Sequence, residues 1–283
     1  MKIYAIFVYA FLYLPIALVI FFSFNAGNYA LDFQGFSTRW YAKALTNPFI
    51  MDALWFSVKV AALSAVMSTV FGTMAALALQ RLSGWKRTFY DALIYVSIMV
   101  PGIVIAIATL IALVTVFKFL NPFLEVLAPL FDGQAPKLSL GFVSLVAAHS
   151  LFTMSLVVVI VRARLSGMDR TLIEASEDLY ASPFRTFVQV TLPQLMPGIL
   201  AAFLLSFTFS FDDFIISFFV AGPNTTLPVY IFSSIRRGIT PEVNVIGTVV
   251  LVGSLILLFS AQFLSTMGKG KKRSASKDDS DDS

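Results

Sequence analysis

Residues 174–193 read EASEDLYASPFRTFVQVTLP. This polar segment lies between two long apolar runs, at about 139–161 and 196–220. An insert with several charged side chains must leave the hydrocarbon core of a bilayer, because each charge is costly there. The segment also carries helix-start signals. We therefore expect it to be structured outside the bilayer and to bind a partner.

The composition places the chain among membrane proteins. Of its 283 residues, 58% are hydrophobic and 13% are charged, and the mean hydropathy is +0.85. Soluble domains have roughly a quarter of their residues charged. Continuous apolar runs favour membrane-spanning helices over a β-barrel, which has short alternating segments. The chain has no cysteine and a single histidine, His149, so disulfides are excluded and no metal site is expected.

Six transmembrane helices are predicted, so the fold class is an all-α polytopic membrane protein. The first span follows Lys2 and lacks a small-residue cleavage site before Asn25, so we expect it to be retained. The third span contains Pro101-Gly102, which predicts a kink. The six spans lie at about 3–24, 54–79, 89–117, 139–161, 196–220 and 244–266.

The distribution of Lys and Arg predicts the orientation. The segments that hold both termini and the 80–88 and 162–195 loops contain 13 of these residues, and the opposite segments contain six. Cytoplasmic loops carry the excess of positive charge, so both termini and this loop should be cytoplasmic. Residues 1–266 then form one six-helix transmembrane domain, and the charged tail 267–283 should be disordered in the cytoplasm. This distribution accounts for the net charge of +4, and no nucleic-acid partner is expected.

The polar loop predicts two short helices. Thr171 and Glu174 have the spacing of a capping box, and Ser182-Pro183 is typical of an N-cap followed by proline at the first helical position. The second helix should run to about Val190, with Pro193 and Pro197 marking the start of the next span. One face of this helix carries an apolar stripe, which could fill a groove in a partner or pack under the protein's own spans; it consists of Phe184, Phe187, Val188 and Thr191.

The loop resembles the EAA motif of ABC-importer permeases. Glu174, Ala175, Leu192 and Pro193 match the family pattern, and Val190 is close to its isoleucine. Two positions depart from the pattern, since Ser176 replaces an alanine and Tyr180 replaces a glycine. A glycine there would serve a turn with positive φ, so tyrosine implies a reshaped turn or a partner groove with room for the ring.

The resemblance implies a type I ABC-importer permease fold in the bacterial inner membrane. It implies a second permease subunit, two ATPase subunits that bind ATP and Mg, and an extracytoplasmic solute-binding protein. The chain itself has no GxxxxGK[ST] loop, so no cofactor and no catalysis are expected of it. By this resemblance the ATPase-coupling residues are Glu174, Ala175, Ser176, Asp178, Leu179, Tyr180, Ala181, Ser182, Pro183, Leu192 and Pro193.

Three further stretches, 24–41, 205–228 and 238–248, resemble the spermidine/putrescine permeases. This resemblance implies that the chain forms half of a translocation pathway for polyamines or a related small solute. The same machinery could instead carry a phosphonate, an iron chelate or an amino acid.

Asp212 and Asp213 are adjacent carboxylates inside a predicted span. Such groups face a cavity, a partner or a water path, because isolation in the bilayer is costly. One reading is that they line the substrate pathway and attract ammonium groups. In the other, one of them pairs with Lys59 or caps a broken helix. His149 is expected to form a hydrogen bond between helices.

Two readings outside this machinery stay open. A proton-coupled secondary carrier could use Asp212, Asp213 and His149, and it would be expected to show inverted repeats. A scaffold without transport would have no need for aspartates inside a span.

Overall fold

The computed structural model describes residues 2–29, 32–126, 137–169, 171–238 and 240–256. The chain divides into two compact units, and each is described by itself below. One unit comprises Met1–Met51 with Ile231–Ser283, and the other comprises Asp52–Tyr230. The tail 267–283 lies outside the described residues.

The all-α polytopic class is confirmed. Five helices are long and apolar enough to cross a membrane: Tyr4–Ser23, Pro48–Gln80, Gly102–Val126, Phe142–Ser166 and Pro183–Phe211. The sixth predicted span begins within an apolar helix, Pro241–Ile256, and its remainder lies outside the described residues. The count of six therefore stays a prediction.

The third predicted span, 89–117, is wrong in its bounds. The structure divides this region into α4, Gly84–Met99, and α5, Gly102–Val126. Between them Val100 has an extended backbone, with ψ 132°. The residue before a proline is sterically disfavoured in the helical region, so Pro101 ends α4 instead of merely kinking a longer helix.

The predicted stop near Val190 is also wrong. Helix α8, Pro183–Thr186, continues through a π-helical turn, η2 (Phe187–Thr191), into α9, Leu192–Phe211. The N–H of Leu192 bonds to the carbonyl of Phe187, five residues back. Proline lacks an N–H and crowds the carbonyl four residues back. The wide π turn directly before Pro193 fits these demands while the helix continues.

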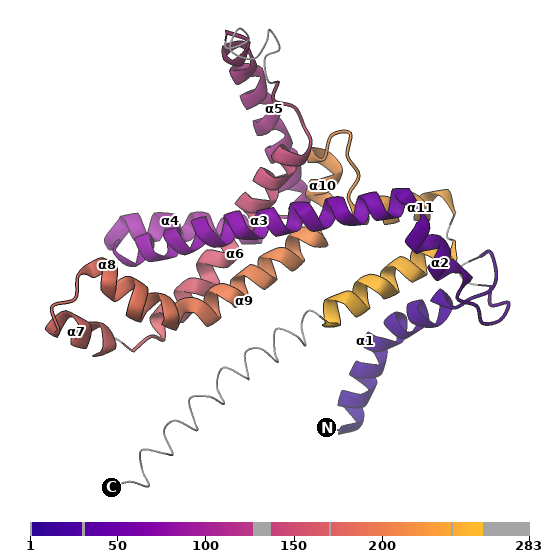
Figure 1. Ribbon diagram of the computed structural model, residues 1–283, viewed down its shortest axis with the longest axis horizontal. Coiled ribbons are helices and arrows are strands. Elements are labelled where there is room, and N and C mark those ends of the chain that lie inside the picture. The colour runs from indigo at the N-terminus through magenta and orange to yellow at the C-terminus, as the bar shows by residue number, and fades with distance from the viewer. Residues whose placement is uncertain (1, 30–31, 127–136, 170, 239, 257–283) are drawn as a thin grey trace. The chain divides into compact units, whose positions relative to one another are not determined.

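Helix α6, Phe142–Ser166, is central to the second unit. It packs against α9, α4 and α10, Ile215–Val220 (Figure 1). Helix α3, Pro48–Gln80, contributes a face of small residues to this core, including the fully buried Ala61 and Ala65. Gly72 lies so close to α6 that a Cβ there would be 2.7 Å from Val157 Cγ1. Small residues let membrane helices approach closely.

Hydroxyl groups connect these helices in the apolar core. Ser64 donates to the carbonyl of Val146 at 3.3 Å, and the hydroxyls of Ser68 and Ser206 are 2.6 Å apart. These serines are buried. Buried polar groups without partners are costly in hydrocarbon, so these bonds help to fix the register of α3 against α6 and α9.

Two arginines fasten α6 to its neighbours near its C-terminal end. Arg162 forms an ion pair with Asp91 of α4. Arg164 Nε donates to the carbonyl of Gln194 at 2.9 Å, and its side chain lies over Gly198, where a Cβ would be 2.9 Å away. The start of α9 is therefore held directly by α6.

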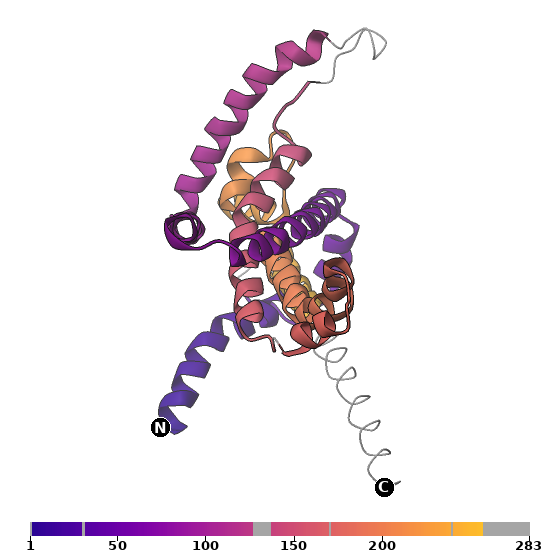
Figure 2. The ribbon, with the colours of Figure 1, turned by 90° about the vertical axis from the view of Figure 1, so that its left-hand side faces the viewer.

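Helix α5 packs on α10 and projects from the other helices of its unit (Figures 1 and 2). Only Ala106 is buried among its residues. Residues 221–243, between the fifth and sixth predicted spans, contain helix α11, Leu227–Arg237.

The first unit contains α1, Lys2–Ser23, and α2, Arg39–Thr46. Buried Asn25 follows α1, and its side-chain amide bonds backbone groups of Gly27, Tyr29, Asp32 and Gln34. Trp40 Nε1 donates to the carbonyl of Gly27 at 2.9 Å. Lys43 Nζ lies 4.6 Å from the Trp40 ring centre and 3.0 Å from Glu242 Oε1.

We predict that Gly72→Ala lowers the midpoint of thermal unfolding of the detergent-solubilised protein. The new methyl group would overlap Val157, and overpacking of this kind costs about 1–3 kcal/mol. Gly253→Ala is the matched control, because nothing lies within 4 Å of a Cβ at that helical position. The control should be neutral or stabilising, since alanine favours helix over glycine. Equal midpoints for Gly72→Ala and the unmodified chain would contradict this packing.

Candidate functional site

The polar loop folds into a helical hairpin at the end of the second unit (Figure 1). Its first helix is α7, Thr171–Asp178, and its second is α8, which continues into η2 and α9. Helix α7 packs on α8 and η2. The Ser176 and Thr186 hydroxyls lie 2.9 Å apart and join α7 to α8, so the serine that departs from the family's alanine has a structural role.

The predicted capping box at Thr171 is wrong. The helix begins at Thr171 itself, so the cap comes from further upstream. Asp169 Oδ1 accepts hydrogen bonds from the Thr171 hydroxyl at 2.7 Å and from the Thr171 N–H at 3.0 Å. These bonds, the side-chain one first, hold the pKa of Asp169 below its ordinary value near 3.8. The cap is complete above that pH and is lost as the pH falls through the lowered pKa.

The turn between the helices is left-handed at Tyr180, with φ 56°. The N–H of Ala181 bonds to the carbonyl of Ser176, and the N–H of Tyr180 bonds to that of Glu177. This pair of bonds defines a Schellman motif, whose left-handed residue is usually glycine. Tyrosine therefore occupies, at Tyr180, the kind of positive-φ position that a glycine would serve.

The predicted start of the second helix is confirmed. Ser182 has an extended backbone, with ψ 153°, and Pro183 follows at the first helical position. Ser182 Oγ accepts from the N–H of Arg185 at 3.4 Å. Leu192 and Pro193, by contrast, lie within the continuous helix rather than at its end.

The tip of the hairpin is exposed and apolar. Tyr180 is 98% exposed, Leu179 is 81% exposed and Phe184 is 77% exposed. Phe184 is largely exposed and Val188 is 41% exposed, whereas Phe187 is half-buried. The stripe on the second helix therefore favours a partner groove over self-packing. Other predicted coupling residues are also exposed on the hairpin: Glu174, Ala175, Asp178, Ser182 and Pro183.

The predicted fifth span is broken at the two aspartates. Helix α9 ends at Phe211, and α10 begins at Ile215. Asp213 Oδ2 accepts a hydrogen bond from the N–H of Ser217 at 3.0 Å, so this carboxylate caps the first turn of α10. Asp212 is exposed, and its backbone N–H closes α9 by bonding to the carbonyl of Thr208.

His149 of α6 lies against this break and is 1% exposed. Its Nδ1 is 2.7 Å from Ser210 Oγ, and its Nε2 is 3.3 Å from Asp213 Oδ2. The expected hydrogen bond between helices is confirmed. Sequence reasoning missed Ser210 and Ser217 as members of this cluster, because serines in apolar spans are common and carry no spacing signal.

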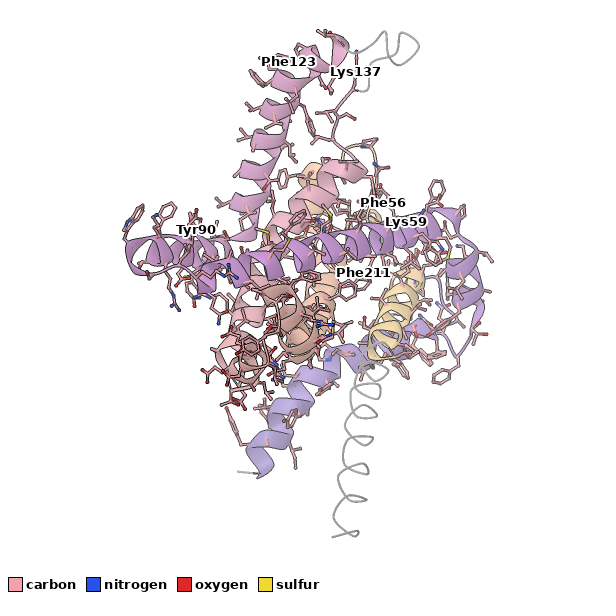
Figure 3. The ribbon with its side chains drawn as sticks, turned by 60° about the vertical axis from the view of Figure 1, so that its left-hand side comes forward. Phe56, Lys59, Tyr90, Phe123, Lys137 and Phe211 are labelled. Atoms are coloured by element: carbon pink, nitrogen blue, oxygen red, sulfur yellow. The ribbon has the colours of Figure 1, made fainter. Side chains whose placement is uncertain are left out.

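Lys59 is not brought to the aspartates as an ion-pair partner. It projects from α3 near Phe56 and is exposed (Figure 3). Within the described part of the chain, no ion pair includes Lys59. Of the two structural alternatives considered for the aspartates, helix capping is therefore the one observed.

The sequence matches a known family. The model of the family described as "Binding-protein-dependent transport system inner membrane component" matches residues 68–267. The chain is 36% identical over 267 residues to the "Spermidine/putrescine transport system permease protein PotC" of Shigella flexneri, covering 93% of this chain and 94% of that protein. It is 33% identical to the "Putrescine transport system permease protein PotI" of Escherichia coli (strain K12), covering 94% and 89%.

The fold is also similar to a solved structure. A chain of a bacterial ABC transporter involved in the import of the acidic polysaccharide alginate aligns with a TM-score of 0.70, covering 94% of this chain and 93% of that one. The sequence identity is 14%, so this likeness concerns the fold alone.

We predict that Tyr180→Gly stabilises the hairpin turn. A left-handed L-residue costs about 1–2 kcal/mol, partly offset by the greater chain entropy of glycine. The net gain of about 1 kcal/mol corresponds to roughly fivefold slower hydrogen exchange at the Ala181 amide. Tyr180→Val should speed this exchange, because β-branched residues tolerate positive φ poorly. Identical exchange in the glycine variant and the unmodified chain would show that the turn carries no strain.

Proposed function

Because the chain belongs to the family of binding-protein-dependent transport system inner membrane components, we propose that it is a membrane-spanning permease subunit of an ATP-driven importer of spermidine and putrescine. The observation that carries the solute assignment is 36% identity to a spermidine/putrescine permease along 93% of the chain. The chain forms half of the translocation pathway and is not itself a catalyst.

The chemistry of the helix break suits such a solute. Polyamines are chains of methylene groups with ammonium groups at neutral pH. Asp212 is an exposed carboxylate between two apolar helices, and no hydrogen bond or ion pair engages its side chain among the described residues. A carboxylate at membrane depth gains most from a cation that neutralises it. Asp212 therefore attracts an ammonium group of the passing solute.

The hairpin 171–186 couples the chain to a separate ATPase subunit. Its exposed tip offers Leu179, Tyr180 and Phe184, the kind of compact apolar set that fills a groove in a partner. Glu174 lies on α7 and offers a charged contact. A complete importer has a second permease, two ATPase subunits that hold ATP and Mg, and an extracytoplasmic solute-binding protein.

Helix continuity suggests how the motion is transmitted. Residues Pro183–Phe211 form one unbroken helical rod from the hairpin to the break at Asp212. Closure of the ATPase subunits moves the hairpin, and the rod carries this displacement to the break. The spans then tilt and switch the pathway between inward and outward access. The chain resides in the bacterial inner membrane with both termini cytoplasmic.

Uptake by the reconstituted complex tests the solute assignment. Proteoliposomes with all subunits should accumulate labelled spermidine and putrescine only when ATP is present. Asp212→Asn should raise the KM for uptake about tenfold, because loss of one moderately screened charge contact is worth at least 1.4 kcal/mol. Asp52→Asn, at an exposed aspartate of α3, is the control and should leave the KM unchanged. ATP-dependent uptake of another solute in place of polyamines would refute the assignment.

Retention of the ATPase tests the coupling role. Phe184→Ala and Glu174→Ala should each weaken retention of the ATPase subunit in detergent about tenfold, because truncating an interface anchor costs over 1 kcal/mol. Trp85→Ala, at an aromatic residue of α4 that is 73% exposed, is the matched control. Full assembly and full transport in both hairpin variants would contradict this role.

A further inference from the structure

The break between α9 and α10 is enclosed by four polar side chains. His149 comes from α6, Ser210 from the last turn of α9, Asp213 from the break and Ser217 from α10. His149, Ser210 and Ser217 are each at most 4% exposed. We call these four residues the His149 cluster. The mechanism of transport proposed above uses none of the three buried members.

The imidazole of His149 connects both sides of the break. Nδ1 lies 2.7 Å from Ser210 Oγ before the break, and Nε2 lies 3.3 Å from both Asp213 Oδ2 and Ser217 Oγ after it. With its proton on Nε2, the ring donates to the Ser217 hydroxyl and accepts from the Ser210 hydroxyl, and Asp213 Oδ2 lies at ion-pair distance from Nε2. This tautomer gives each ring nitrogen a partner, as burial in an apolar core requires.

The two aspartates therefore have different surroundings. Asp213 Oδ2 faces the Ser217 N–H at 3.0 Å and the imidazole of His149, and its side chain is 16% exposed. Asp212 is exposed and has no such partners within the described residues. A carboxylate that already accepts a hydrogen bond and faces an imidazole has less to gain from a mobile ammonium group than one with neither partner.

We propose that His149 is a positioning residue that keeps Asp213 at the helix break and thereby leaves Asp212 as the carboxylate of the pair that meets the cationic solute. The identity of the solute rests on the proposed function, but the positioning of the helix break by His149 does not. His149 acts through Asp213 and touches no substrate. Removal of its side chain frees Asp213 and loosens the first turn of α10.

The absence of native cysteine allows a direct test of this hold. In the assembled complex, Ser217→Cys places a thiol of similar shape inside the His149 cluster. Its alkylation by N-ethylmaleimide, followed by the mass of this chain, should become at least about tenfold faster when His149→Ala is added, because local opening sets the rate. Ser206→Cys is the matched control, since Ser206 is equally buried but bonds to Ser68. Its rate should not change.

Two conservative substitutions distinguish the contact made by Nδ1 of His149 from the contacts made by Nε2. His149→Gln places an amide nitrogen at the reach of Nε2 and should keep Ser217→Cys protected. His149→Asn reaches only the position of Nδ1, so it keeps the Ser210 contact, loses the Asp213 contact and should leave the thiol reactive. Equal rates in the two variants would overturn the positioning role, because only glutamine reaches the position of Nε2.

Polyamine uptake then tests whether Asp212 and Asp213 have different roles. Asp213→Asn retains an acceptor for the Ser217 N–H and should raise the KM less than about twofold, whereas Asp212→Asn raises it about tenfold. Equal increases in KM for the two aspartate variants would overturn the proposal. An alkylation rate of Ser217→Cys that does not change when His149→Ala is added would also overturn it. If the unmodified complex takes up no polyamine, the proposed function fails, whereas the thiol rates still decide whether His149 holds the break.

Discussion

The structure depends on how one interrupted helix satisfies its polar groups inside an apolar core. At residues 212–214 the helix stops, and a bilayer offers no water to the carboxylates and backbone groups that this exposes. Asp213 supplies an acceptor to α10, and His149 supplies a bridge from α6 to both sides of the break. The small face of α3 and Arg164 at the end of α6 hold α6 and α9 close enough for this bridge to form.

The same helix connects the break to the hairpin that we propose binds the ATPase subunit. The π turn at Phe187–Thr191 lets the helix pass Pro193 without ending. A hairpin joined to the membrane core by a flexible linker would lose displacement at the linker, whereas a continuous rod transmits it. The exposed apolar tip and the polar break thus lie at the two ends of one continuous helix, as the proposed coupling to an ATPase subunit needs.

Local signals in the sequence predicted local features. Apolar runs gave the membrane class, Ser182-Pro183 predicted a helix start, and the glycine-like position of Tyr180 proved to have positive φ. The misses have physical causes. Proline predicts the end of a helix only where no π turn relieves its steric clash. The continuation of the helix through Pro193 was therefore not predicted. The partners of His149 lie 61 and 68 residues away in sequence, and only tertiary packing brings them to it.

The central claim is that the helix break gives its two aspartates different tasks. The most direct measurement is a high-resolution cryo-EM structure of the assembled importer trapped with spermidine in the pathway. We expect an amine nitrogen at the carboxylate of Asp212, with His149 still between Ser210 and Asp213. An amine nitrogen at Asp213 with the imidazole displaced from it would contradict the account.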